Sequence, residues 1–208
     1  MASSMIHIAV ANEVNKKLNR NKRELLIGSI APDISKLLNQ SKLKSHFLDD
    51  IEADIPNIDK FLIKYKNNLN DDFVMGYYIH LYTDYLWRKY FFPEIYDNNT
   101  LTKLNGEKFV CTDKEMQYYI YNDYTNLNIK LIDKFDLDLA IFYEEIPTLN
   151  DIIKEIPMDK INLIIEKAGI IIANTKENKE YTFNVDNIEK FINTSTDLII
   201  ANIEEINN

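Results

Sequence analysis

The chain has 208 residues, of which 46% are hydrophobic, which is enough for one folded domain with a buried core. Its 4 glycines and 5 prolines are too few for a turn-rich β protein. The 24 basic and 33 acidic residues give a net charge of −9, which argues against a protein that binds long nucleic acids or anionic membranes through lysine and arginine.

Three features of the sequence concern its compartment. The single cysteine, Cys111, excludes an intramolecular disulfide. No run of the chain approaches the roughly 18 apolar residues that a membrane span needs. The first residues, MASSMIHIAVANEV, lack the basic region of a signal peptide. We therefore expect a cytoplasmic protein without a transmembrane segment.

The first predicted helix covers residues 4–19, with Ser3 or Ser4 as its N-cap. His7 is the first member of its apolar face, and the other members are Val10, Ala11, Val14 and Leu18. This placement fits either a metal ligand or a core histidine that hydrogen-bonds to a backbone carbonyl.

A second helix is predicted over residues 22–30 and ends at Gly28–Ser29. Pro32 stops the helix and fixes the turn that follows it. Asp33 is therefore held at a rigid break directly after a buried segment. It is either a site residue or the cap of a next short helix.

The connection over residues 36–56 is predicted to be mostly irregular, and it contains His46. A lone histidine in a loop commonly lies on the surface, yet long connections often carry function. We expect this loop, together with a hairpin predicted near Asn105–Gly106, to line the rim of any pocket. Asn57 is then expected to cap a helix that ends near Asn70.

Residues 71–92, DDFVMGYYIHLYTDYLWRKYFF, form the most apolar predicted helix. One face recurs at spacings of four and three residues, as a helix requires, and carries Phe73, Tyr77, His80, Asp84, Trp87 and Phe91. His80 and Asp84 lie one turn apart on this face. Burying a charge there is costly unless a partner or a metal ion neutralises it. The pattern fits a buried histidine–aspartate hydrogen bond as well as a metal site.

After the central helix the pattern changes. Asn105–Gly106 between two short runs predicts one small β-hairpin near residues 101–110. A helix is expected from Asp113 to about Phe135, and within it Asp123 either supports the site from behind or is an exposed carboxylate. Isoleucine-rich stripes predict further packing helices in the last third, and we assign no chemistry to residues 136–208.

Histidine and aspartate are ligands of zinc and similar divalent ions, and helical proteins build metal sites from such inward residues. Four stretches carry them in the order Ser4-Met-Ile-His7, Gly28-Ser-Ile-Ala-Pro32-Asp33, Ser45-His46-Phe47 and Gly76-Tyr-Tyr-Ile-His80-Leu-Tyr-Thr-Asp84. In this order they resemble the zinc-dependent phospholipase C family of bacterial zinc phospholipases and related single-strand nucleases. The resemblance covers roughly the first 90 residues.

The resemblance implies an all-α, multi-helix bundle of the phospholipase C and single-strand nuclease type that holds a metal cluster. It implies that Asp84 bridges two ions and that Asp33 lies near the water between them. The family's third zinc needs further ligands beyond the central helix, and this chain has no histidine after His80. One or two ions are therefore expected.

The sequence thus predicts a single all-α domain over residues 1–208 with one small β-hairpin. The expected ligands of zinc or a similar divalent ion are His7, His46, His80 and Asp84, with Asp33 as a further ligand or as the general base. The expected reaction is metal-assisted hydrolysis of a small phosphoester. Arg88 either contacts a phosphate oxygen or forms a surface ion pair.

Two alternatives remain at this stage. One is a non-catalytic protein that keeps the scaffold with a structural or vestigial metal ion, because the ligands of the third zinc are missing. The other is a phosphohydrolase of the HD type, which needs an adjacent His-Asp pair that this chain lacks.

Overall fold

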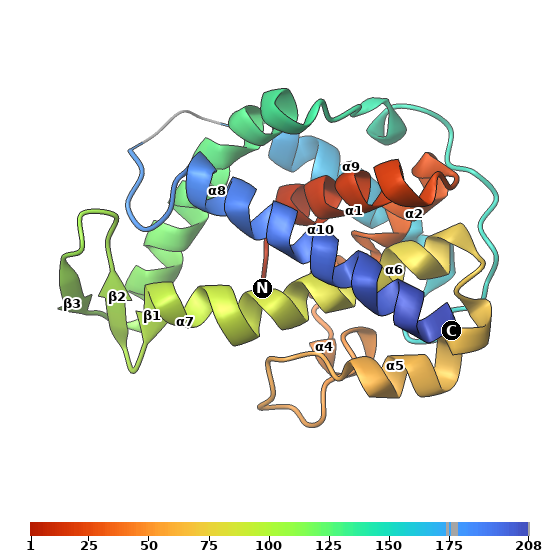
Figure 1. Ribbon diagram of the computed structural model, residues 1–208, viewed down its shortest axis with the longest axis horizontal. Helices are drawn as coiled ribbons and strands as arrows, with labels where there is room; N and C mark the ends of the chain where they lie inside the picture. The colour runs from red at the N-terminus through yellow and green to blue at the C-terminus, as the bar shows by residue number, and fades with distance from the viewer. Residues whose placement is uncertain (174, 176–178, 208) are drawn as a thin grey trace.

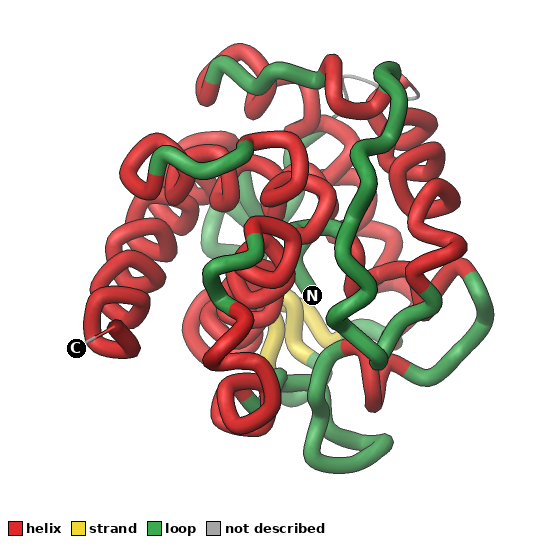
Figure 2. Tube along the Cα trace, turned by 90° about the vertical axis from the view of Figure 1, so that its right-hand side faces the viewer, coloured by secondary structure: helices red, strands yellow, loops and turns green. Residues whose placement is uncertain are grey.

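The computed structural model describes residues 1–173, 175 and 179–207 of the chain. These residues are mostly helical, with a small antiparallel sheet of three strands at one end of the molecule (Figure 1). Figure 2 shows that helices make up most of the body and that long loops connect them. The α-helices are α1 (Ser4–Leu18), α2 (Lys22–Gly28), α3 (Ile34–Leu37), α4 (Lys42–Ser45), α5 (Ile58–Tyr65), α6 (Asp72–Leu86), α7 (Phe92–Ile95), α8 (Asp113–Phe135), α9 (Ile161–Ala173) and α10 (Val185–Asn207). Shorter turns are the 3-10 segments η1 (Ala31–Asp33), η2 (Lys66–Asn68), η4 (Ala140–Phe142) and η5 (Met158–Lys160) and the π-helical turn η3 (Trp87–Phe91).

Helix α1 runs through the core. Its prediction is confirmed, and Ser3 is the N-cap, because its hydroxyl accepts a hydrogen bond from the backbone N–H of Ile6. The helix contacts α2, α6, α8 and α10. Every residue from Met5 to Asn12 is buried, so this part of the helix is covered on all sides. The His7 side chain therefore lies in the interior.

The central helix is confirmed over most of its predicted length. Helix α6 begins after Asp71, which caps it by accepting from the N–H of Val74, and it continues through η3 into α7. The predicted apolar stripe is fully buried from Phe73 to Trp87, whereas Phe91, inside the π-helical turn, is only partly buried. The stripe thus faces the core along the whole of α6.

Helices α2 and α6 touch backbone to backbone. A Cβ atom on Gly76 would stand 2.0 Å from the Leu25 carbonyl oxygen, and one on Gly28 would stand 2.2 Å from the Phe73 carbonyl oxygen. Only glycine fits at these two positions, because any side chain would force the helices apart. This close approach brings the end of α2 against the face of α6 that carries His80.

The predicted β-hairpin is part of a larger sheet. Strand β2 (Thr100–Thr102) pairs with β3 (Lys108–Val110) on either side of the Asn-Gly turn, as predicted. The prediction of a lone hairpin is wrong, because β1 (Tyr96–Asp97) pairs with β2 from the other side. Asn98 and Asn99 make that turn with positive φ angles of 47° and 58°. A two-residue strand is too short to show an alternating pattern.

The C-terminal helices pack as the isoleucine stripes predict. Helix α9 buries Ile161, Ile164 and Ile165, and α10 buries Ile188 and Ile199 among others. Within the described residues, the buried apolar side chains of these helices join those of the N-terminal half in one core. No helix among the described residues has the length and apolar character that would let it cross a membrane.

Asp123 on α8 is buried and binds the segment that leads into α10. Its carboxylate accepts hydrogen bonds from the backbone N–H groups of Tyr181, Thr182 and Phe183 at 2.9, 2.7 and 3.3 Å, and from the Thr182 hydroxyl at 2.5 Å. Both predictions for this residue are therefore wrong: it is neither exposed nor bonded to the histidines, but holds the entry to α10 against α8.

Asp123→Asn should lower the stability of the fold by about 3 kcal/mol. The amide has one oxygen in place of two, and its NH₂ group would face N–H donors that lose their acceptor. A chain of this size then melts about 6–12 °C lower, which calorimetry measures. Asp133→Asn, an exposed change on the same helix, is the control. Equal melting temperatures for the two variants would contradict the role of Asp123.

Candidate metal centre

Five side chains from four segments meet beside the C-terminal half of α6. His7 comes from α1, Asp33 from the end of η1, His46 from the residue after α4, and His80 and Asp84 from α6. The structure brings together all five residues that the sequence predicts for the site. They form two overlapping groups that could hold a metal ion, His7–His80–Asp84 and Asp33–His46–His80, with the ligand atoms of each group within 4.8 Å of one another.

Helix α2 fixes the orientation of His80. The Nδ1 atom of this ring lies 2.7 Å from the backbone carbonyl oxygen of Ser29, directly after the glycine contact of α2 with α6. A carbonyl oxygen only accepts, so Nδ1 carries the hydrogen and donates it. In the neutral ring, Nε2 is then free of hydrogen and offers its lone pair to the interior.

A chain of hydroxyl groups fixes His46 in the same way. The Ser35 hydroxyl donates to the carbonyl oxygen of Pro32, and the Ser45 hydroxyl donates to Ser35 at 3.0 Å. Because its hydrogen is used there, Ser45 accepts from His46 Nδ1, which lies 2.9 Å from its oxygen. The Nε2 atom of a neutral His46 therefore also carries a bare lone pair.

These two lone pairs point at each other and at a carboxylate. The Nε2 atoms of His46 and His80 are 3.3 Å apart, and Asp84 Oδ2 lies 3.8 and 3.5 Å from them. All three side chains are fully buried, and Oδ2 accepts no hydrogen bond from any residue that the structure describes. Three electron-rich atoms this close repel one another unless a proton or a metal ion lies among them. Four ligand atoms bound tetrahedrally to zinc stand about 3.3 Å apart, so the spacing fits such an ion.

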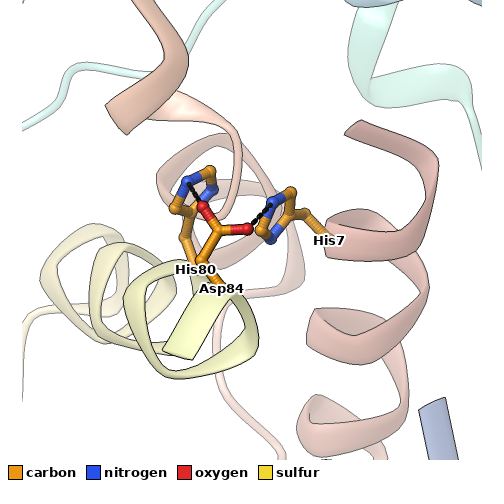
Figure 3. Close-up of side chains that lie close together, drawn as sticks. All are labelled: His7, His80 and Asp84. Carbon is orange, nitrogen blue, oxygen red and sulfur yellow. Dashed lines mark ion pairs between the residues drawn. The ribbon is translucent and has the colours of Figure 1, made fainter. Parts of the chain in front are cut away.

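His7 approaches Asp84 from the other side (Figure 3). Its Nε2 atom lies 3.4 Å from Asp84 Oδ1, and its ring stacks on that of His80 with centroids 3.8 Å apart. Neither ring nitrogen makes a hydrogen bond with any described residue, so the alternative of a core histidine bonded to a carbonyl is wrong. A buried nitrogen without a partner costs about 1–3 kcal/mol, which a bound ion would relieve.

Burial decides the charge state of two of the rings. It lowers the pKa of His46 well below the usual histidine value, and His80 adds to this shift. It also lowers the pKa of His7, again with a contribution from His80. Both rings are therefore neutral at neutral pH, which is the form that binds metals. Burial alone would raise the pKa of Asp84, but His7 and His80 hold it well below its usual range.

Asp33 lies at the edge of the centre and is partly exposed. Its Oδ1 atom lies 3.7 Å from His46 Nε2 and 3.4 Å from Lys42 Nζ. Burial would raise the pKa of this carboxyl, but His80, Lys42 and His46 together lower it to about 2. Asp33 occupies the N-cap position of α3, yet its side chain makes no capping hydrogen bond, so the cap alternative is wrong. The alternative of a surface His46 is wrong as well, because that ring is fully buried.

Sequence reasoning did not assign several residues that contact the centre or lie near it. The loop over residues 36–56 contributes Lys42, and also Asp54, which pairs with Arg88. The backbone N–H of Ala2 donates to Asp84 Oδ1 at 2.9 Å, and the Tyr124 hydroxyl donates to the carbonyl oxygen of Met1 at 2.8 Å. Such backbone contacts leave no signal in a residue pattern. The sheet lies at the far end of the molecule and is not the rim we expected of the hairpin (Figure 1).

Comparison of the chain with known protein families, curated proteins and solved structures identifies no relative. No protein-family model matches the chain, and no curated protein or solved structure matches it either.

Proposed function

We propose that the chain is a metal-dependent hydrolase of a small phosphoester. The observation that carries the proposal is the meeting of three electron-rich atoms, Nε2 of His46, Nε2 of His80 and Oδ2 of Asp84, in a fully buried place. Nitrogen and carboxylate oxygen donors suit zinc, and the spacing fits tetrahedral ligation. The four sequence stretches that resemble the zinc-dependent phospholipase C family, and the mostly helical fold, favour a bundle of that type.

The ligands of this proposal are His7, His46, His80 and Asp84, with Asp33 at the edge. Two groups that share His80 allow one ion, or two ions with Asp84 between them, since its two oxygens face different histidines. A bound divalent ion would supply Lewis acidity, which lowers the pKa of a water ligand to about 7 and stabilises oxyanions in the transition state.

The protein's own groups hold the centre ready for this chemistry. Ser29 and Ser45 lock His80 and His46 in one tautomer each, a support that metal sites commonly have. Asp33, partly exposed beside Lys42, is the group that a water or a substrate from solvent would meet. A carboxylate with a pKa of about 2 is a weak proton acceptor at neutral pH. The low pKa therefore favours a role for Asp33 as a metal ligand, or as a hydrogen-bond acceptor that orients a water molecule. It argues against Asp33 as a general base.

A second candidate is a non-catalytic protein with a structural metal ion. It is favoured by the burial of four of the five side chains, since structural sites are closed whereas catalytic sites keep an open position. The partly exposed Asp33 is the feature that favours catalysis.

The cytoplasmic location also stays a prediction of the sequence.

Metal analysis and an assay on generic substrates test these proposals together. Protein purified without chelator should carry about one or two zinc or similar ions per chain and hydrolyse p-nitrophenyl phosphate or its diester. Chelation should stop hydrolysis, and it should lower the melting temperature, because an ion held at 100 times its Kd adds about 2.7 kcal/mol of stability. Metal without hydrolysis would support the structural site, and protein without affinity for divalent ions would refute both proposals.

A further inference from the structure

A pocket lined by lysines is formed by α4, α5 and the segment that joins η4 to η5. Its volume is about 410 Å³, which lies within the range of small-molecule sites. Figure 1 shows α4 and α5 at the lower edge of the molecule. Lys44 comes from α4, Lys60 and Lys64 come from α5, and Lys154 comes from the joining segment. The five side chains of the candidate metal centre do not line this pocket.

The charges that line this pocket are mostly positive. Among the described residues of the lining, the four lysines carry positive charge and Glu155 carries negative charge, which leaves three positive charges. The whole chain has a net charge of −9, so the pocket departs from the overall charge of the protein. A concave site lined by charges of one sign concentrates ions of the opposite sign. The pocket therefore favours an anion.

Three of the four lysines are available to an anion. Lys60 pairs with Asp49 at 2.8 Å, and Lys154 pairs with Asp151 at 2.7 Å. Neither carboxylate lines the pocket, and the four paired side chains are between 45% and 69% exposed. Such exposed ion pairs contribute little to stability, so each ammonium group can turn away from its carboxylate at small cost. Lys44 forms no ion pair with any residue that the structure describes.

The wall that carries Lys64 and Lys154 is held in place by hydrogen bonds. The Tyr65 hydroxyl on α5 donates to Glu155 Oε2 at 2.6 Å and accepts from the backbone N–H of Lys154 at 3.1 Å. Lys64 pairs with the other carboxylate oxygen of Glu155, whose side chain is only 12% exposed. These contacts fix the joining segment on α5 without a ligand, and a preformed site loses less conformational entropy when it binds.

Apolar side chains form the rest of the lining. Phe47 and Leu48 each keep only 8% of their surface exposed, and Leu43 is half-buried. An inorganic ion would contact the ammonium groups alone. An apolar group attached to the anion would also cover these side chains from water, which is favourable. The lining therefore suits an organic anion better than an inorganic one.

We propose that this pocket binds a small organic anion with at least two negative charges and an apolar part. Lysine binds carboxylates and phosphates as a point charge, because its ammonium group lacks the planar fork of arginine. The number of charges should therefore govern affinity more than the kind of acid group. The volume of about 410 Å³ suits a small molecule, whereas basic residues spread over a surface bind an anionic membrane. The inference does not depend on the proposed function, since the pocket and the metal centre share no residue.

Two anions without a phosphoester bond test the inference. Naphthalenedicarboxylate presents two carboxylates and phenylphosphonate presents a phosphate-like group, and calorimetric titration at about pH 8 should show that both bind. Naphthoate, with one charge, should bind about 10-fold more weakly than the dicarboxylate, as expected for a lost hydrogen bond between charged groups. Inorganic phosphate should bind more weakly than phenylphosphonate, because it leaves the apolar side chains uncovered. Added salt should weaken the binding of all four.

Substitution of single lysines locates the binding site. Lys44→Gln and Lys154→Gln should each weaken binding of the dicarboxylate about 10-fold. Both side chains are exposed, so the melting temperature should stay nearly unchanged. Lys66→Gln, in η2 directly after α5, and Lys160→Gln, in η5, are the matched controls, since both are exposed lysines outside the pocket. Both controls should bind the dicarboxylate as the wild type does.

The outcomes are distinct from those of the proposed function. Normal binding by the Lys44→Gln and Lys154→Gln proteins would overturn the inference, and so would a wild-type protein that binds neither probe. Binding of phosphatidylserine vesicles without binding of the small anions would overturn it as well. Binding of one probe alone, weakened in both variants, would support the site and identify its acid group. The weakening should be the same before and after zinc is added, so the result stands whether or not the protein is a metal-dependent hydrolase.

Discussion

Asp84→Asn is expected to lose bound metal together with any hydrolytic activity. Asp84 faces all three histidines, with Oδ1 toward His7 and Oδ2 toward His46 and His80. The amide has no charge and a single acceptor oxygen, so it cannot neutralise an ion or bridge two of them. Metal affinity should fall more than about 100-fold, the upper value for changes outside the ligand set. Elemental analysis and metal titration of the purified variant measure this.

Two further variants make the Asp84 result specific. Glu94→Gln removes an exposed carboxylate on α7 and should leave metal content unchanged. Asp33→Asn should keep at least one ion and the fold. It should slow hydrolysis by less than the roughly 10²- to 10⁴-fold that the loss of a general base costs, because the low pKa favours Asp33 as an acceptor that orients water. Normal metal content in Asp84→Asn would remove Asp84 from the ligands. Equal loss of metal in both aspartate variants would make Asp33 a ligand alone.

Gly76→Ala is expected to be among the most damaging single substitutions in the protein. The added methyl group would stand 2.0 Å from the carbonyl oxygen of Leu25 and 3.0 Å from the Cα of Gly28, and both are backbone atoms that cannot rotate away. Forcing extra volume into a packed core costs about 1–3 kcal/mol and more when backbones must separate. We expect a loss of about 3 kcal/mol or more and a melting temperature at least about 6–12 °C lower. Metal affinity should fall as well, because separation of α2 from α6 draws the Ser29 carbonyl away from His80.

Gly169→Ala is the matched control for this prediction. Gly169 lies in α9, where the nearest atom to an added Cβ is 4.0 Å away, so alanine meets no clash. Alanine is the better helix former, and this change should stabilise the protein by about 0.5–1 kcal/mol. Thermal melting of both variants gives the comparison. A Gly76→Ala protein as stable as the wild type would show that α2 and α6 are not held at this distance.

The sequence predicted the helices of this chain well because their signals are local. Ser3 and Asn57 cap α1 and α5 by accepting hydrogen bonds from amides three residues away, and the spacing of the α6 stripe follows from the helical repeat. The same local pattern placed His80 and Asp84 on one buried face. The prediction that His7, Asp33 and His46 converge on that face came from the order of the four sequence stretches that resemble the phospholipase C family. Helical periodicity alone predicts no contact between separate segments.

The remaining features depend on contacts that no residue pattern encodes. The partner of His80 is a backbone carbonyl, Ser29 O, and the partners of Asp123 are the backbone amides of Tyr181 to Phe183. Every residue has a carbonyl and nearly every residue an amide, so the sequence cannot say which of them a buried side chain will find. The contact of Lys42 with Asp33 was missed for a different reason. A lysine in a polar connecting segment looks in the sequence like any other surface lysine.

The order of the ligands along the chain decides when an ion can be captured during folding. Only His80 and Asp84 are neighbours on one helix, and three other segments must close on α6 before His7, Asp33 and His46 reach them. The unfolded chain therefore offers an ion little more than one histidine–aspartate pair. Interactions that form late in folding slow the unfolding rate and leave the folding rate nearly unchanged. A bound ion would accordingly make this protein long-lived in its native state without making it fold faster.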